Sequence, residues 1–160
     1  MQTWIEDFRP SLDETAAFLK TIPADRLDRK MKADGWNMRQ LLGHLIDSAC
    51  NNHRRFTLAA MQDHLRFEGY AQEEWVKIND YDSRDWQDLI QLWHGFNLQI
   101  CHLMGTYSAE KLDQPTTDHN LDQIAFRLVP TGEATSLGYF MRDYIGHYKH
   151  HLAQIQEITK

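Results

Sequence analysis

The chain has 160 residues, of which 42% are hydrophobic and 25% charged, a composition typical of a soluble globular protein. This length predicts a single domain that spans residues 1–160. The 17 basic residues are scattered among 23 acidic ones and the formal net charge is −6, which argues against a protein that binds nucleic acid through its phosphates.

The first half of the chain predicts two helices. The first begins at Ser11, because that residue and the three after it have the spacing of a capping box, and it ends before Pro23. The second begins near Asn37, whose side chain can cap the helix together with Gln40, and it ends around Asp63. Hydrophobic residues recur along both at spacings of three, four and seven, as they do on one face of a helix.

The second half predicts two more helices of similar length. The third begins at Asp82 or Ser83, and Gly105 is its natural end. The fourth begins near Thr135 or Ser136 and continues to the end of the chain. Residues 124–129 alternate well enough for a short strand, but for too few residues to require a sheet.

These elements predict an all-α fold, a four-helix bundle with two long connections at about residues 64–81 and 106–134. Side chains on facing helices often hold metals in the cores of such bundles. Connections of this length often shape the mouth of a site or a surface for a partner.

The sequence also predicts a cytoplasmic protein. No basic segment followed by an apolar run begins the chain, and no apolar window is long enough to span a membrane. Cys50 and Cys101 have neither a CxxC spacing nor the pattern of a disulfide framework, which fits a reducing compartment.

Two histidines of the last predicted helix have the spacing of a metal-binding pair. His147 and His151 lie four residues apart, so their rings point the same way and can bind one divalent metal. At about 100° per residue His151 falls on the edge of the apolar face and His147 lies about 40° farther round, whereas His150 points away from the core alongside Asp143. Tyr148 follows His147 where a zinc protease of the HExxH type carries Glu, so that class is disfavoured.

A third ligand has to come from another helix, and His44 is the strongest candidate. Ser48, Asn51 and Arg55 follow it on the same side of the second helix, a polar ridge that fits either a site or a solvent-facing surface. Asp47 is a candidate ligand, general base or hydrogen-bond acceptor for a ligand. Three histidines with at least one open position are typical of a catalytic metal.

Five segments of the chain resemble the DinB-like family, in particular its YfiT-type members, which are described as metal-dependent hydrolases. The similarity lies in residues 35–48 (GWNMRQLLGHLIDS), 51–56 (NNHRRF), 68–75 (EGYAQEEW), 92–94 (LWH) and 146–155 (GHYKHHLAQI). They occur in the family's order and are spread over most of the chain, from residue 35 to residue 155.

This resemblance implies a four-helix bundle with one metal per chain, zinc or nickel, held by His44, His147 and His151. It also implies a homodimer. Gln154 departs from the pattern, because that position often carries His, and the connection at residues 106–134 matches the family poorly.

Two reactions on a small molecule fit such a site. In one, a metal-bound water attacks an ester, amide or similar bond, with Asp47 or another nearby carboxylate as proton acceptor. In the other, the metal activates a low-molecular-weight thiol, since relatives resembling this chain include S-transferases that use bacillithiol or mycothiol. The alternative is a non-catalytic helical module that dimerises, binds metal or responds to stress.

Overall fold

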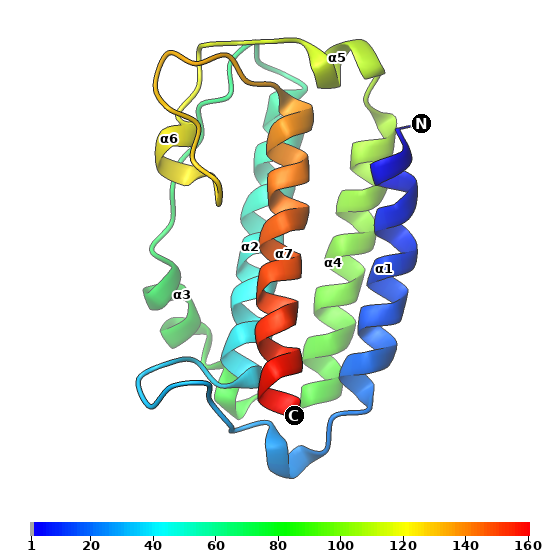
Figure 1. The fold of residues 1–160 in the computed structure, drawn as a ribbon, viewed down its shortest axis with the longest axis vertical. Helices are drawn as coiled ribbons and strands as arrows, with labels where there is room; N and C mark the ends of the chain where they lie inside the picture. The colour runs from blue at the N-terminus through cyan, green and yellow to red at the C-terminus, as the bar shows by residue number, and fades with distance from the viewer. Residues whose placement is uncertain (1) are drawn as a thin grey trace.

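The computed structural model describes residues 2–160, and these form a bundle of four long helices (Figure 1). The four helices are α1 (Thr3–Lys20), α2 (Met38–Ala59), α4 (Trp86–Thr106) and α7 (Leu137–Thr159). Between them lie five short elements: η1 (Ala24–Arg26), α3 (Gln72–Asn79), η2 (Tyr81–Ser83), α5 (Ala109–Asp113) and α6 (Leu121–Ile124). No strand occurs within residues 2–160, so the all-α four-helix bundle predicted from the sequence is confirmed.

The four long helices follow one another around the bundle in an order that differs from their order in the chain. α4 packs between α1 and α2, and α7 packs between α2 and α1. Figure 1 shows α1 and α7 running down the bundle while α2 and α4 run up it. As a result α2 and α4 are parallel neighbours, and the connection between them, which includes α3, runs back along the side of the bundle. The other two connections between long helices lie at its ends.

Aromatic side chains fill the space between the helices. Phe56 of α2 packs edge-on against Phe140 of α7, with ring centroids 5.5 Å apart, and Trp93 of α4 lies 5.6 Å from Tyr148 of α7. All four are almost fully buried, which makes them large contributors to the hydrophobic stabilisation of the bundle. Across residues 2–160, no helix has the length and apolar character needed to cross a membrane.

The predicted start of the first helix is wrong. α1 begins at Thr3 and passes through Pro10, and Ser11 lies inside it, where its hydroxyl donates to the carbonyl of Phe8. Ile5, Phe8 and Leu12 are all buried, so the apolar stripe continues toward the N-terminus. The burial of this extra segment outweighs the backbone hydrogen bond that proline cannot donate.

The other helix starts agree more closely with the prediction. Asn37 caps α2 in a reciprocal capping box with Gln40, and Ser136 caps α7. α4 starts later than predicted, because Asp85 accepts the first free N–H groups and Tyr81–Ser83 forms a separate 3-10 turn. α2 also ends earlier than the predicted Asp63, at Ala59.

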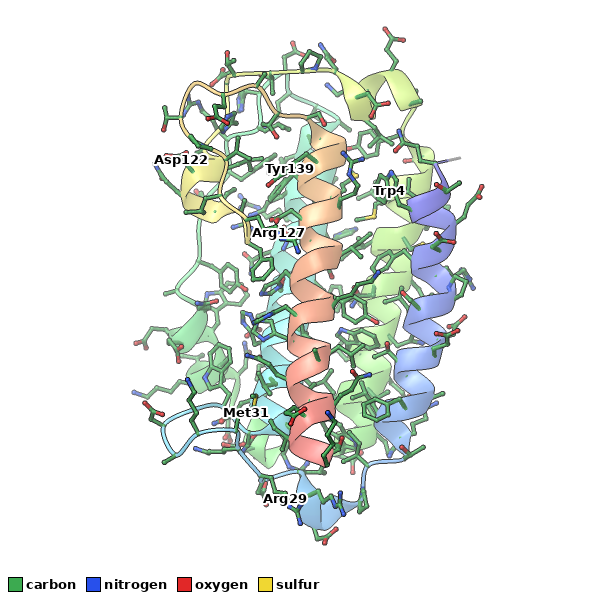
Figure 2. All side chains as sticks on the ribbon, in the orientation of Figure 1. Trp4, Arg29, Met31, Asp122, Arg127 and Tyr139 are labelled. Carbon is green, nitrogen blue, oxygen red and sulfur yellow. The ribbon has the colours of Figure 1, made fainter. Side chains whose placement is uncertain are left out.

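The two long connections meet near the end of the bundle at which α2 ends. Leu65 of the first pairs with the segment around His119 of the second through backbone hydrogen bonds, and His119 is buried with its Nε2 on the carbonyl of Glu133. Farther along, Tyr139 of α7 donates to the carbonyl of Arg127, and Figure 2 shows both side chains where this connection meets α7. Residues 124–129 therefore run from the end of α6 into a loop, not a strand.

Candidate metal centre

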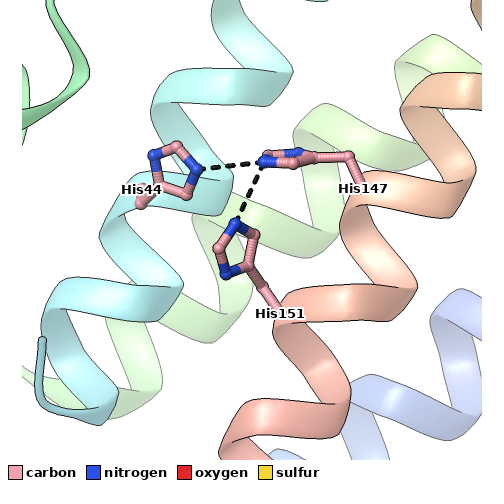
Figure 3. A group of neighbouring side chains, drawn as sticks. All are labelled: His44, His147 and His151. Carbon is pink, nitrogen blue, oxygen red and sulfur yellow. Dashed lines mark hydrogen bonds between the residues drawn. The ribbon is translucent and has the colours of Figure 1, made fainter. Parts of the chain in front are cut away.

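Three histidines from two helices meet between α2 and α7 (Figure 3). His44 comes from α2, and His147 and His151 come from successive turns of α7. The Nε2 atom of His147 lies 3.1 Å from Nε2 of His44 and 3.0 Å from Nε2 of His151. The structure therefore brings together the three residues singled out in the sequence, and places His150, as expected, on the exposed side.

Local structure explains why the rings point at one another. The capping box at Asn37 fixes the start of α2, which puts His44 two turns later on the same buried side as Leu41 and Leu45. His147 and His151 project together because residues four apart share a helix face. The ring of Trp36 packs 4.8 Å from that of His44, and the ring of Phe126 packs 5.4 Å from that of His147.

All three imidazoles are neutral near pH 7. Burial lowers the pKa of His44 to about 3 and that of His147 to about 2, with smaller contributions from the neighbouring histidines. Burial also lowers the pKa of His151, although its hydrogen bond to Gln154 acts in the opposite direction. Each ring then carries one N–H and one free lone pair, the form in which histidine binds a metal.

Gln154 determines which nitrogen of His151 is free. Its Oε1 lies 2.6 Å from Nδ1 of His151, so Nδ1 carries the proton and Nε2 presents its lone pair to the other histidines. The glutamine that departs from the family pattern in the sequence thus has a defined role. In the neighbouring His147, Nδ1 lies 3.3 Å from the hydroxyl of Ser48, which can accept a hydrogen bond from the Nδ1–H group.

Hydrogen bonds alone cannot account for the three converging nitrogens. Nε2 of His151 can only accept a hydrogen bond, so it needs a proton on Nε2 of His147. With that proton in place, Nε2 of His147 has no lone pair with which to accept a hydrogen bond from His44. A cation satisfies all three lone pairs at once. Two nitrogens bound to one tetrahedral zinc lie about 3.3 Å apart, close to the separations seen here.

Two cavities with different lining residues reach the cluster. One, of about 360 Å³, has His147 in its wall together with polar residues of α2 and aromatic residues of α7 and the loop after α6. The other, of about 370 Å³, has His151 and Gln154 in its wall beside Trp36 and Glu73. A small molecule in either cavity lies next to a histidine of the cluster.

Asp47 lies apart from both cavities. Its Oδ1 accepts hydrogen bonds from the hydroxyl of Tyr81 and the side-chain amide of Asn79, while its buried Oδ2 has no partner within residues 2–160. Burial raises the pKa of Asp47 to about 6, an effect that these two hydrogen bonds partly oppose. The role of this carboxylate as a base stays a prediction.

The polar residues that follow His44 along α2 have different roles. Ser48 and Arg55 line the cavity beside His147, whereas Asn51 donates to the carbonyl of Asp47 one turn earlier. Asn52, which the sequence pattern does not single out, also lines this cavity.

The position of Asp143 on the last helix predicts a side chain that faces solvent, and that prediction is wrong. The loop after α6 folds over it, and its two oxygens accept the backbone N–H groups of Phe126 and Arg127 at 2.7 and 2.8 Å. Asp143 therefore holds Phe126 against His147. A helical wheel contains no information on where a distant loop will lie, so no sequence signal could have found this contact.

Comparisons with known proteins agree with this fold. The chain is 28% identical over 160 residues to a protein of Bacillus cereus (strain AH820) and to one of Bacillus anthracis (strain A0248), each named "Putative metal-dependent hydrolase". The alignments cover 100% of this chain and 86% of each relative.

A solved structure has the same architecture. YfiT from Bacillus subtilis, described as "a probable metal-dependent hydrolase with an unusual four-helix bundle topology", superimposes with a TM-score of 0.76 at 22% identity. The superposition covers 99% of this chain and 87% of YfiT. Finally, the family model of the DinB superfamily matches residues 8–155. The chain therefore belongs to the DinB superfamily, as its motifs had indicated.

Proposed function

We propose that this protein is a metal-dependent enzyme that holds one divalent metal with His44, His147 and His151 and hydrolyses a small molecule. The observation that carries the proposal is the convergence of three neutral imidazoles at the wall of a cavity, with the N–H groups of His147 and His151 directed outward to Ser48 and Gln154. The names of the relatives in Bacillus cereus and Bacillus anthracis support the same reaction class. Imidazole ligands suit zinc and nickel, and these are the metals we propose.

A metal held by three histidines supplies a Lewis acid that lowers the pKa of water or of a thiol at its open positions. The residues around the histidines hold these side chains in place and orient their lone pairs. Gln154 keeps the lone pair of His151 directed inward, and Ser48 does the same for His147. Phe126, held by Asp143, covers one side of His147 and limits access of bulk water.

Two carboxylates, those of Asp47 and Asp143, are candidates for the proton acceptor in hydrolysis. Asp47, with a pKa raised to about 6, is largely ionised at pH 7 and remains our candidate base, through its unpartnered Oδ2. Asp143 lines the cavity beside His147, but both of its oxygens already accept backbone N–H groups. We therefore assign Asp143 to positioning.

Transfer of a thiolate is the second reaction that this site could support. One cavity includes His147 in its wall and the other His151, so a thiol and an electrophile could each occupy a separate cavity beside the cluster. We further propose, from the family resemblance, that the chain forms a homodimer. The sequence features described above lead us to propose also that it acts in the cytoplasm and that residues 1–160 form one domain.

Metal content is the first test. We expect tag-free wild-type protein to contain about one zinc or nickel ion per chain by elemental analysis, and His147→Ala to contain almost none. His150→Ala is the matched control, because His150 is a neighbouring exposed histidine of the same helix, and it should retain the metal. A wild-type protein that stays metal-free after supplementation would leave a non-catalytic helical module as the better account.

The reaction type follows from turnover with and without a thiol. A hydrolase should cleave small esters or amides in the absence of any thiol, and His147→Ala should lose that activity. A transferase should consume an electrophile such as a haloaromatic compound only when a low-molecular-weight thiol is present. The metal-loaded wild type is the starting material for both assays.

A further inference from the structure

Arg55 of α2 is a buried cation at the wall of the cavity beside His147. Only 4% of its surface is exposed, although arginine is rarely buried without a charged partner. Its neighbour Arg54 shows the usual arrangement, being exposed and ion-paired with the carboxylate of Glu68 at 3.2 Å. Among residues 2–160, no carboxylate lies within ion-pair distance of Arg55.

The groups around the Arg55 guanidinium are all neutral. Nη2 donates to the backbone carbonyl of Glu68 at 2.7 Å, and Nη1 makes a longer hydrogen bond of 3.4 Å to Oδ1 of Asn52. The guanidinium carbon lies 5.9 Å from the centre of the Tyr70 ring. Burial raises the pKa of Tyr70 to about 12, so the phenol does not supply a negative charge.

These contacts do not explain why the residue is an arginine. Holding the segment around Glu68 against α2 uses two of the five N–H groups of a guanidinium, and a neutral donor could do the same. A buried charge without a counter-ion destabilises the fold, because neutral partners replace only part of its lost hydration. The carboxylate in the cavity wall, that of Asp143, is engaged by the N–H groups of Phe126 and Arg127.

We propose that Arg55 is an anion-binding residue and that the substrate of this site carries a carboxylate or phosphate group, which Arg55 holds while the rest of the molecule lies beside His147. A guanidinium fork matches the two oxygens of either group. Tyr70, Phe126 and Tyr144 provide aromatic surface in the same cavity for the body of the ligand. The assignment of this ligand as a substrate rests on the proposed function, whereas the binding of an anion does not.

Matched small probes test the charge requirement directly. Benzoate and benzamide have nearly the same shape, but only benzoate is anionic at neutral pH, and phenyl phosphate presents the other anion. We would measure their affinity for chelator-treated, metal-free protein by isothermal titration calorimetry at constant ionic strength. We expect at least one of the two anions to bind about tenfold or more tightly than benzamide, and the better of the two identifies the group. Equal affinity for the anions and benzamide, or no binding by either anion, would overturn the proposal.

Variants then assign the binding to Arg55. Arg55→Met keeps most of the side-chain volume and removes the charge, so the preference for the anion over benzamide should disappear. Arg54→Met is the matched control on the same helix, and it should bind like wild type. If circular dichroism shows that Arg55→Met is unfolded, Arg55→Lys replaces it, with an affinity for the anion lowered several-fold because the fork is lost. An anion that binds equally to wild type and to the folded variant would exclude Arg55.

The outcomes separate this inference from the proposed function. Binding is measured without metal, so a protein that takes up zinc but prefers no anion contradicts only the role of Arg55. A protein that prefers the anion but takes up no metal contradicts only the metal-dependent reaction. His147→Ala, measured with the same probes in the absence of metal, should retain the preference, since Arg55 is unchanged in it.

Discussion

At the scale of single residues, the site depends on side chains whose charge state is set by burial. The three histidines are neutral because the bundle excludes water from them, and neutrality is what a metal ligand requires. Arg55 keeps its charge among neutral groups. Burial raises the pKa of the Asp47 carboxyl group to about 6, so both its neutral and its charged form are populated near that pH.

The pKa of Asp47 predicts how stability changes with pH. Its folded-state pKa of about 6 is above the unfolded value of about 3.9, so this group favours folding most below about pH 4, and that contribution is lost as pH rises to about 6. Asp47→Asn removes the charge, so the variant should gain stability relative to wild type between about pH 4 and 7, by up to about 3 kcal/mol. Urea unfolding of metal-free protein measures this difference.

A difference that stays constant over this pH range would contradict the assignment. Tyr81→Phe provides a second check, because it removes a hydrogen bond that favours the charged carboxylate. The loss of stability with rising pH should then continue to a higher pH than in wild type.

At the scale of elements, close packing of η2 on α2 positions the residues around His44. A Cβ atom on Gly43 would lie 2.0 Å from the ring of Tyr81, so only glycine allows this ring to cross α2 and reach Asp47. The adjacent His44 depends on the same turn of helix. A glycine inside a helix is unfavourable by itself, and here the contact with Tyr81 explains its presence.

Gly43→Ala should therefore destabilise the protein despite the higher helix propensity of alanine. Displacement of the Tyr81 ring should lower the free energy of unfolding by about 1–3 kcal/mol, as overpacking of a core does. Gly95→Ala is the control in α4, because a Cβ atom at Gly95 would meet no atom of a neighbouring segment of residues 2–160 within 4 Å. This variant should gain about 0.5–1 kcal/mol of stability. Chemical denaturation measures both changes, and a stabilised Gly43→Ala would show that Tyr81 can move freely.

The sequence predicts those elements whose signals are local. The caps at Asn37 and Ser136 and the pairing of His147 with His151 depend on neighbours along one helix, and all are present. Ser11 misled the prediction of α1, because a serine inside a helix can donate to the preceding turn as well as cap a new one.

The contacts that could not be predicted join distant segments. The path of the long connections determines that a loop covers Asp143. It also determines that, among residues 2–160, Arg55 meets a backbone carbonyl and no carboxylate. The hydrophobic periodicity of α2 and α7 does not predict the course of these connections. The convergence of His44 with the α7 pair was reached from the sequence through the family resemblance and a polar ridge that also fitted a solvent-facing surface.

At the scale of the whole molecule, the histidine cluster links two of the four long helices. A metal that binds the folded chain and not the unfolded one stabilises the fold by about 2.7 kcal/mol when its free concentration is about a hundred times Kd. For a chain of this size each kcal/mol raises Tm by about 2–4 °C. Saturating zinc or nickel should therefore raise Tm by about 5–10 °C, and removal with a chelator should reverse the change.

Differential scanning calorimetry with and without metal measures this shift. His147→Ala should show almost no response to metal, while His150→Ala should respond like wild type. An equal response in His147→Ala would place the bound metal elsewhere.

The separation of the ligands along the chain also has a consequence for the rate of unfolding. His44 lies 103 residues before His147, so the complete ligand set exists only after α2 and α7 have docked. Contacts between such distant segments require the closure of a long loop and form late in folding. A metal held there stabilises the native state more than the folding barrier, so it should leave the folding rate almost unchanged and prolong the lifetime of the folded bundle.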